Sequence, residues 1–380
     1  MITIIGGGIG GLTTALAFEK HGIDYHIFEK APSLKTAGAG IWLAPNALQV
    51  LDWLGILDKI AEKGNTIDRI SVTNQDLSPL SDTHQGFVVD TFGFSTIAIH
   101  RAELQEILLK SIPKHKITLG KAFHKFEKAT PQKIKVIFED NSSTVTDTLI
   151  GADGIHSKIR KQLFSKSKIR YSGQTCWRGV ADIKIDSDFE HRGIEMWGNQ
   201  IRFGISRISD QKVYWFAVVT SKPNQKDNTT HLKNKLLEIF SEFHPIVHQL
   251  ISNTMNDKII RGDINDITPL QQWHTDTICL IGDACHSATP DMGQGGAQAI
   301  EDAYYLSHFI NNEENTEIAF SKFQKKRYSK VNAIVKLSRR TEKIAHWKYG
   351  QSFRNFILKS TPNKILEKKM IKMYQIEKMN

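Results

Sequence analysis

The sequence contains only three cysteines in 380 residues, and it has no apolar run long enough to cross a bilayer. Cys176, Cys279 and Cys285 are widely spaced and form no CxxC pair, so neither a disulfide framework nor a structural zinc site is expected. The first residues lack the basic segment of a secretory signal peptide and begin a strand pattern at once. These absences favour a protein of the reducing cytoplasm that holds no metal.

Acidic residues are scarce only at the C-terminal end. Residues 321–380 hold 17 Lys and Arg against 3 Glu, a balance of +14, whereas the rest of the chain carries −4. The body therefore has no basic footprint for nucleic acid. The basic end is expected to be the solvated face of C-terminal helices broken at Pro362, with contact to an anionic membrane surface as the alternative.

Glycine, in contrast, is concentrated in a turn near the start of the chain. A short apolar strand meets Gly6, Gly8 and Gly11 in GxGxxG spacing, a helical pattern follows, and a second strand ends at Glu29. GxGxxG alone is weak, but strand, turn, helix, strand and acid together predict a dinucleotide site. Phosphates would lie at the helix N-terminus and the ribose at Glu29. The acid favours FAD or NAD over NADP.

Two later segments point to the same place. Residues 149–154 end a strand at small residues and Asp153, and Asp153 and Ser157 are expected to cap the next helix. Residues 277–283 form an apolar strand that ends at Asp283, where ribose or ribityl hydroxyls would lie. Three glycines then leave backbone N–H groups bare at a helix start, which suits the negative charge of a reduced flavin ring. They are Gly293, Gly295 and Gly296.

The remaining segments complete a predicted α/β fold. A Rossmann-like nucleotide-binding domain with a mainly parallel sheet covers residues 1–70, 98–170 and 265–330, and C-terminal helices cover 331–380. A mostly antiparallel sheet domain is inserted at 71–97 and 171–264, with residues 87–89 and 92–94 expected as short strands. The small-residue loop 31–40, which contains Gly38, could lie against a flat ring or be an ordinary connection. His286 has no carboxylate partner visible in the sequence and is expected to be structural.

Three segments together carry a resemblance that covers nearly the whole chain. GGGIGG…FEK, GADGIHSKIR and GDACHSATPDMGQGGAQAIEDA resemble the single-component FAD-dependent aromatic monooxygenases of the para-hydroxybenzoate hydroxylase type. TPDMGQGGAQAIEDA and HRAELQ are most similar to the subgroup of FAD-dependent urate hydroxylases and zeaxanthin epoxidase-like proteins. The fold implied is an FAD-binding domain with an inserted substrate sheet.

The resemblance also implies cofactor contacts. Gly6, Gly8 and Gly11 would hold the pyrophosphate, with Glu29 at the adenosine ribose and Lys30 beside it. Trp42 would lie in a loop that lines the flavin. The other implied contacts are Arg101, Phe123 through its backbone, Asp153, Asp283 at the ribityl chain, and the backbone of Gly293, Gln294, Gly295, Gly296 and Ala297. The family has no second GxGxxG for NADH or NADPH, and none is present here, so the donor would visit and leave.

In the family, reduced flavin captures dioxygen as a C4a-hydroperoxide and transfers one oxygen atom to an electron-rich ring or alkene. The substrate site is then expected to be apolar and aromatic with a few polar anchors. The candidates are Arg178, Arg202, Tyr214 and Trp215. Arg202 and Tyr214 lie roughly where urate hydroxylases place an anchoring arginine and an aromatic residue. Arg178 stands where those enzymes carry Asn, which argues against urate itself, and surface or intersheet ion pairs are the alternative reading of both arginines.

The resulting hypothesis is a monooxygenase that uses FAD, NADH or NADPH and dioxygen to hydroxylate a small aromatic or heteroaromatic substrate. Within the class, an alkene epoxidase or a hydroxylase of polycyclic phenols or antibiotics is the alternative. From other classes, a flavoprotein reductase or a non-catalytic flavin-binding module would share the first glycine turn. A monomer and a homodimer are both compatible with the sequence.

Overall fold

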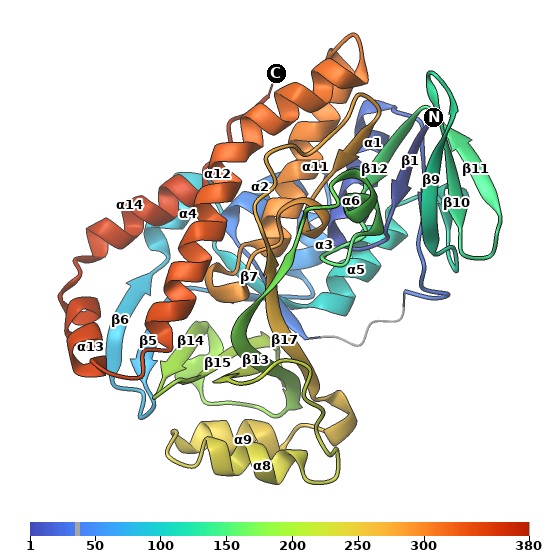
Figure 1. The fold of residues 1–380 in the computed structure, drawn as a ribbon. Coiled ribbons are helices and arrows are strands. Elements are labelled where there is room, and N and C mark those ends of the chain that lie inside the picture. Colours follow the sequence, from blue (N-terminus) through green and yellow to red (C-terminus); the bar gives the residue numbers. More distant parts are fainter. Residues whose placement is uncertain (35–38, 380) are drawn as a thin grey trace.

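Five parallel strands form the central sheet of the computed structural model, which describes residues 1–34 and 39–379 (Figure 1). The strand order is β18 (Ile278–Leu280), β12 (Thr148–Gly151), β1 (Ile2–Ile5), β2 (Tyr25–Phe28) and β8 (Ile117–Thr118). The register pairs Ile5 with Gly151 and Gly151 with Leu280, so three strands end side by side. Ligands bind outside the carboxyl ends of such strands, which places the nucleotide site at this edge.

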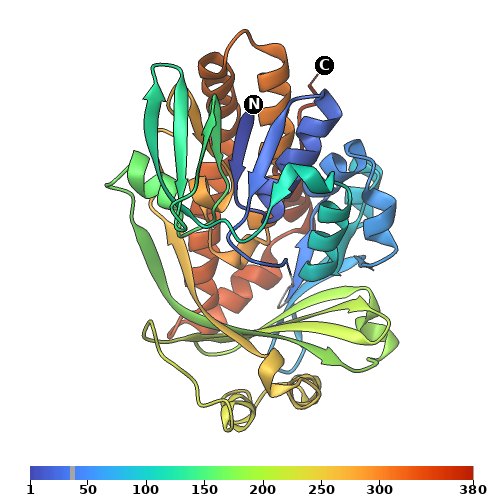
Figure 2. The same ribbon diagram turned by 90° about the vertical axis from the view of Figure 1, so that its right-hand side faces the viewer.

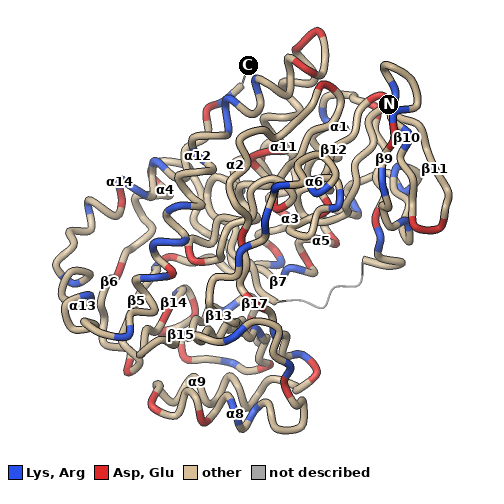
Figure 3. The backbone as a smooth tube through the Cα atoms, viewed as in Figure 1, with Lys and Arg blue, Asp and Glu red and all other residues tan. Residues whose placement is uncertain are grey.

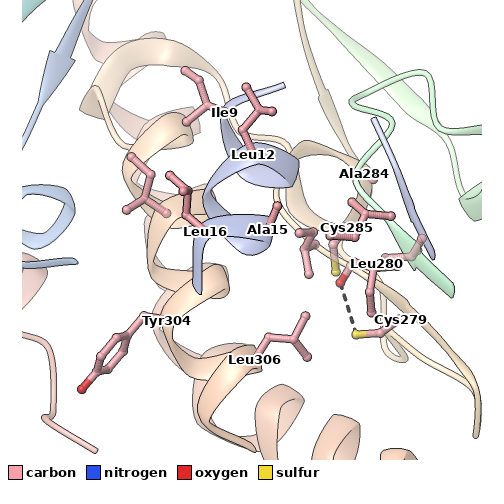
Figure 4. Close-up of a cluster of buried hydrophobic side chains, with 14 of the residues drawn as sticks. Ile9, Leu12, Ala15, Leu16, Cys279, Leu280, Ala284, Cys285, Tyr304 and Leu306 are labelled. Carbon is pink, nitrogen blue, oxygen red and sulfur yellow. Dashed lines mark hydrogen bonds between the residues drawn. The ribbon is translucent and has the colours of Figure 1, made fainter. Parts of the chain in front are cut away.

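Helices pack on this sheet through small residues. A Cβ atom on Gly10 of α1 (Ile9–His21) would lie 3.2 Å from the Cβ of Ala299 in α11 (Gly295–Asn312), so the two helices approach closely. The close-up shows the apolar residues of α1 packed against α11 and against the segment of Cys279 and Cys285 (Figure 4). All three cysteines are buried and unpaired. They therefore act as small apolar side chains.

A second sheet of seven strands lies apart from the first. Its order is β17 (Ile260–Ile267), β13 (Ile169–Asp182), β16 (Lys212–Thr220), β15 (Ile201–Ser209), β14 (Arg192–Trp197), β5 (Arg69–Asn74) and β6 (Pro79–His84). Only the β14–β5 pair is parallel, which confirms a mostly antiparallel inserted sheet. One face is covered by α8 (Leu232–Ile239) and α9 (Pro245–Ser252), which lie below the sheet in Figure 2. The opposite face is turned toward the nucleotide-binding part of the chain.

Two small sheets complete the fold. β3 (Gly40–Leu43), β7 (Thr96–His100) and β4 (Asn65–Ile67) form one three-stranded sheet, and β9 (Phe123–Thr130), β10 (Lys133–Phe138) and β11 (Ser143–Thr146) form another. The connecting helices are α2 (Pro45–Trp53), α3 (Leu57–Ala61), α5 (Arg101–Lys110), α6 (Lys158–Leu163), α7 (Ser187–Glu190) and α10 (Asp283–His286). Short 3-10 turns lie at Lys114–Lys116, Asn256–Lys258 and Pro290–Met292.

One part of the expected sheet domain is helical instead. Residues 87–89 and 92–94 were predicted as strands, but α4 (Gly86–Phe92) runs through the first and ends before Gly93, which adopts a positive φ of 80°. Short apolar runs do not distinguish strand from helix by periodicity. The helical conformation buries Val88 in a cluster with Tyr374, which is distant in sequence and near the C-terminus. The strand prediction for these residues is wrong.

The C-terminal helices begin earlier than expected. α12 (Thr316–Ala345) is a 30-residue helix that crosses the boundary placed at residues 330 and 331. It is followed by α13 (Gln351–Ser360) and α14 (Asn363–Tyr374), with the break at Pro362 as the sequence predicted. In Figure 1, α12 runs along the molecule and α13 lies beside β6. None of the helices in the described residues has the length and apolarity that a membrane span requires.

Candidate active site

The first glycine turn is shaped by three different demands. Gly6 has a φ of 114°, and a Cβ there would overlap the carbonyl of Ala152. A Cβ on Gly11 would overlap the carbonyl oxygen of Gly6, so both positions require the absence of a side chain. A Cβ on Gly8 would meet nothing within 4 Å. Gly8 therefore borders open space at the N-terminus of α1, where an anionic diphosphate can reach free N–H groups.

Glu29 lies directly against this turn. Its side chain is buried; Oε2 accepts a hydrogen bond from the N–H of Gly7 at 2.6 Å and Oε1 one from Ala31 at 2.8 Å. The backbone of Glu29 also bonds to Thr118 and Lys121, which brings the start of β9 and Phe123 to the same edge. Lys30 is exposed. Each carboxylate oxygen keeps a second acceptor position for a ribose hydroxyl.

The second turn holds Asp153 against α6. Its Oδ2 accepts the N–H of Lys158 at 2.8 Å, and Ser157 Oγ accepts that of Arg160, so both caps expected from the sequence are present. Oδ1 is buried without a partner, and burial raises the pKa of Asp153. A buried acceptor without a donor is costly, so this oxygen is suited to a ligand donor.

Arg160 links the second turn to the third, and the sequence offered no signal for that role. Its Nη1 donates to the carbonyl of Ala284 at 2.9 Å, and its guanidinium lies within electrostatic range of Asp153 and Asp283. Asp283 keeps accessible surface although protein encloses it on most sides. This loss of solvation raises its pKa, and His286 and Arg101 offset part of the effect. Such an environment belongs to a group that lines a binding site.

The start of α11 faces the same space. Gly293 has a φ of 60°, and a Cβ there would meet nothing within 4 Å; a Cβ on Gly295 would lie 3.9 Å from Asp283 Oδ1. The carboxamide nitrogen of Gln294 is buried without a partner, while its oxygen accepts from Asn46 at 3.0 Å. Ala297 is fully buried. The helix thus offers an unpaired buried donor and an open N-terminus beside Asp283.

His286 does have a carboxylate partner, contrary to the expectation from sequence. Its Nε2 lies 2.6 Å from Oδ2 of Asp302, which also accepts the N–H of Gly282 at 2.9 Å. Oδ1 of Asp302 accepts from Arg327 at 2.8 Å. Burial opposes ionisation of Asp302, but His286 and Arg327 outweigh it and lower its pKa. His286 is held in this buried network behind the site, as its structural assignment requires.

The segment before α2 differs from the loop that was expected. Trp42 lies in strand β3, and its Nε1 donates to Ser206 Oγ at 2.9 Å, so its ring is turned to the large sheet. A Cβ on Gly193 would overlap that ring. The preceding side chain, Ile41, points the other way, and its Cδ1 would lie 3.0 Å from a Cβ on Gly296. The loop assignment for Trp42 is therefore wrong, and residues 35–38 of the preceding segment lie outside the described residues.

Arg101 lies at the first position of α5 and is exposed, near enough to Asp283 to offset part of the rise that burial causes in the pKa of that carboxyl. α5 itself is held against the first turn, because Gln105 Nε2 donates to the carbonyl of Gly7 at 2.9 Å. The three predicted turns therefore converge, with Arg101 at their edge.

The inner face of the large sheet carries the candidate substrate residues. Register places Arg178, Phe216, Gly204 and Glu195 in one row across four strands. The Phe216 ring lies over Gly204, where a Cβ would overlap it. Arg178 is half-buried, and no described carboxylate lies within 4.0 Å of it. Its guanidinium does interact with the Tyr214 side chain through a hydrogen bond, and a guanidinium beside an aromatic ring is suited to a planar anion.

Tyr214 lies one row along from Arg178 on this face, and its ring packs under Gly40. Burial raises the pKa of Tyr214 to about 12, and the Arg178 guanidinium beside it acts in the opposite direction. The phenol is therefore a neutral hydrogen-bonding group at ordinary pH. Trp215 points to the opposite face, stacked on Phe203 and donating to Thr254 at 2.8 Å. The structure does not bring Trp215 together with the other candidates.

Arg202 is on the inner face but is already engaged. It is 2% exposed, and its guanidinium forms ion pairs at 2.8 Å with Glu195 and with Asp291, just before Gly293. It also bonds to Gln174 at 3.1 Å and to Nε2 of His346 at 2.8 Å. Arg202 thus connects the sheet to the segment that leads into α11. Its contacts are those of the alternative considered from the sequence, in which the arginine forms ion pairs within the protein.

These observations test whether FAD fits. The clashes at Gly6 and Gly11 with open space at Gly8, the unpartnered oxygen of Asp153 and the unpartnered nitrogen of Gln294 leave room and hydrogen-bonding capacity at the turns where a dinucleotide flavin would need them. The residues present fit the cofactor. No group of three or more metal-ligating side chains occurs in the part of the chain that the structure describes.

Comparison with known proteins gives the same answer. Residues 1–335 match the family described as FAD binding domain. The aurachin C monooxygenase/isomerase of Stigmatella aurantiaca is 36% identical over 346 residues, which cover 91% of this chain and 90% of the relative. The 6-hydroxynicotinate 3-monooxygenase of Pseudomonas fluorescens is 28% identical over 369 residues, covering 92% and 94%.

Two further matches correspond to the subgroup expected from the sequence. The zeaxanthin epoxidase of Prunus armeniaca is 35% identical over 323 residues, which cover 80% of this chain and 48% of the epoxidase. The crystal structure of Klebsiella pneumoniae HpxO complexed with FAD and uric acid has a TM-score of 0.91 and 27% identity, covering 98% of this chain and 96% of that one. The chain belongs to the FAD binding domain family and is an FAD-dependent monooxygenase.

Proposed function

We propose that the enzyme transfers one oxygen atom to a small, planar nitrogen heteroaromatic ring that carries an acidic oxygen substituent. The observation that carries this proposal is Arg178, a half-buried cation without a described carboxylate partner, on the sheet face that meets Asp291. A ring oxygen with negative charge would complete its coordination. The relatives named for 6-hydroxynicotinate and the neighbour that binds uric acid act on rings of this kind, which supports the proposal.

The cofactor contacts form part of this proposal. Bound FAD supplies the redox chemistry, accepting electrons from NADH or NADPH and activating dioxygen. The glycine turn and the N-terminus of α1 would bind the diphosphate, Glu29 the ribose and Asp283 the ribityl hydroxyls. The other proposed contacts are Lys30, Arg101, Phe123, Asp153 and the backbone of Gly293, Gln294, Gly295, Gly296 and Ala297. The N-terminus of α11 would stabilise negative charge on the ring.

The substrate side has a separate division of roles. Arg178 would orient the ring through its charged oxygen, and Tyr214 would donate or accept one neutral hydrogen bond beside it. Phe216 would cover the ring face and exclude water, which limits wasteful release of peroxide. Arg202 would hold the segment before Gly293 in place rather than contact substrate, because its donors are already used.

The test is a panel of paired compounds. FAD-loaded enzyme would be assayed for NADH and NADPH oxidation with 6-hydroxynicotinate, a 3-hydroxy-4-quinolone, urate and salicylate, each beside an O-methylated counterpart. We expect stimulation by at least one of the free nitrogen heterocycles and not by salicylate, loss of that stimulation on methylation, and one labelled oxygen atom in the product under ¹⁸O₂. Equal rates for both members of every pair would contradict the role of the anion.

Alkene epoxidation is the second candidate, supported by the similarity to zeaxanthin epoxidase. A hydrocarbon substrate would leave the half-buried Arg178 guanidinium with the neutral Tyr214 side chain but without an anion, which is unfavourable. Stimulation by a carotenoid or another alkene, with an epoxide as the labelled product, would favour this candidate instead.

A cytoplasmic location and a state of monomer or homodimer are also proposed for the enzyme. Three buried, unpaired cysteines are compatible with a reducing compartment. Equilibrium sedimentation of the FAD-loaded protein would determine the oligomeric state.

A further inference from the structure

Helix α13 exposes its two phenylalanines and Ile357 and buries Arg354. Tyr349 is 79% exposed, Phe353 62%, Phe356 65% and Ile357 45%. Residues three and four positions apart share one helix face, so the two phenylalanines and the isoleucine form one outward surface that Tyr349 extends. We call these four residues the aromatic face of α13. Surface aromatics gathered in this way mark an interaction site.

The inner contacts of α13 show that this orientation is specified. Arg354 is 3% exposed; its Nη1 donates to the carbonyl of Ala345 at 2.9 Å, and its guanidinium lies 5.2 Å from the Trp197 ring centre. Asn355 Nδ2 donates to Asn74 Oδ1 at 2.9 Å. If α13 rotated about its axis to bury the phenylalanines, the hydrogen bonds of Arg354 and Asn355 would break. The aromatic face is thus directed outward by polar anchoring on its other side.

Exposed lysines flank the aromatic face in sequence, and Lys348 lies over the Tyr349 ring. Residues 343–372 hold eight Lys and Arg against a single acid, Glu367. All seven lysines of this stretch are exposed; they are Lys343, Lys348, Lys359, Lys364, Lys368, Lys369 and Lys372. Figure 3 shows this run of basic residues along α13 and α14. Apolar side chains with a basic surround are the pattern of a helix that lies in the interface of an anionic membrane.

We propose that α13 and the start of α14 dock the enzyme on an anionic lipid bilayer, with the aromatic face inserted among the acyl chains and the lysines at the headgroups. A second copy of this chain is a poorer occupant, because a two-fold interface would bring the two lysine sets together. The contact is peripheral, since no described helix has the length and apolarity of a membrane span.

The test uses the full FAD-loaded chain and flotation with phosphatidylcholine vesicles, either pure or with about one-third phosphatidylglycerol. We expect binding to the anionic vesicles alone, weakened by added salt. Phe353→Ser combined with Phe356→Ser should lower affinity by about a hundredfold, given the apolar area removed. Lys359→Gln, Lys364→Gln and Lys368→Gln together should also lower it by about a hundredfold, at about fivefold for each charge.

Matched controls lie elsewhere on the surface. Met255 is 59% exposed, so Met255→Ser removes an exposed apolar side chain far from α13. Lys125→Gln, Lys128→Gln and Lys135→Gln remove three exposed lysines from β9 and β10. Both controls should bind like wild type, and all variants should retain FAD and activity in solution.

Three results would overturn the proposal. The first is that wild type fails to float with anionic vesicles. The second is that the double phenylalanine variant binds as tightly as Met255→Ser. The third is a stable dimer in sedimentation that this variant dissociates, because the aromatic face would then be an interface between copies.

Discussion

The nucleotide-binding turns and the inner face of the large sheet are built in different ways. The turns use backbone, and their central requirement is that Gly6 and Gly11 carry no side chain. The sheet face uses charged and aromatic side chains from four strands, whose surroundings decide what each does. Arg178 and Arg202 illustrate this, because they share one face and differ in their partners. The first region should therefore be sensitive to added atoms and the second to removed charge.

The largest effect is expected from an added methyl group in the first turn. Gly11→Ala places a Cβ against the carbonyl of Gly6, whereas Gly8→Ala meets nothing within 4 Å. Gly11→Ala should abolish FAD retention and lower stability by several kcal/mol, about the cost of overpacking. Gly8→Ala should fold normally and weaken FAD binding only, since its methyl group would occupy ligand space. Flavin absorbance after gel filtration and thermal unfolding would separate the two, and equal losses would contradict the distinction.

The next effect concerns the engaged arginine. Arg202→Gln leaves Glu195 and Asp291 without their cation in a buried setting, and breaking a buried pair costs about 3–5 kcal/mol. We expect a large fall in the free energy of unfolding with a modest change in the Michaelis constant. Denaturant unfolding and steady-state kinetics would be compared with Arg207→Gln, which removes an arginine paired with the more exposed Glu190 and Asp210. If Arg202→Gln proved as stable as Arg207→Gln, the structural role assigned to Arg202 would be contradicted.

A buried carboxyl beside Arg202 gives a pH-dependent prediction. Glu342 is 2% exposed, and burial near Asp291 raises its pKa from 4.5 to about 7. The folded state then binds this proton more tightly than the unfolded chain, so the group destabilises the fold progressively as pH rises from about 4.5 to about 7. Glu342→Gln should be more stable than wild type by about 1–3 kcal/mol above pH 7.

The same variant should match wild type in stability below about pH 4.5, where both side chains are neutral. The neighbouring imidazole of His346 has the opposite pH dependence. Burial, together with Arg202, lowers the pKa of His346 to about 2, so this group destabilises the fold increasingly as pH falls below 6.5. Denaturant unfolding across this pH range provides the measurement. A stability difference that is constant with pH would contradict the raised pKa.

The smallest effect is expected where Trp42 meets the sheet. Ser206→Ala removes the acceptor of the Trp42 indole N–H, a hydrogen bond of 2.9 Å. The ring remains packed on Gly193, so the loss should be about 1 kcal/mol of stability with FAD content unchanged. Thermal unfolding would measure it against Ser221→Ala, whose hydroxyl donates only to a neighbouring carbonyl. A loss of flavin in Ser206→Ala would mean that Trp42 lines the cofactor after all.

The same contrast explains what the sequence could predict. The turn at Gly6 to Gly11, the strand end at Glu29 and the helix start at Gly295 are local patterns, and the structure has each of them close to its expected place. The parallel and antiparallel sheets followed from hydrophobic patterning. The partner of His286 did not, because Asp302 is brought to it only when α11 folds back over β18.

On the sheet face, period-two alternation alone excludes Tyr214 and Trp215 from the same surface, so one of these two candidates was avoidable. The different partners of Arg178 and Arg202 were not foreseeable, since Asp291 and His346 come from segments 89 and 144 residues away from Arg202 in sequence. Arg160 and Ile41 were also missed, because their positions depend on contacts between separate turns.

The most direct test of the account is a binding cycle on Arg178. Wild type and Arg178→Gln, both loaded with FAD, would be titrated with an active ring compound and with its O-methyl counterpart, following the flavin spectrum. If the guanidinium holds the charged oxygen, the variant should lose about 10- to 100-fold in affinity for the free compound and little for the ether. Equal losses for both ligands, or none for either, would show that Arg178 does not bind the charged oxygen of the substrate.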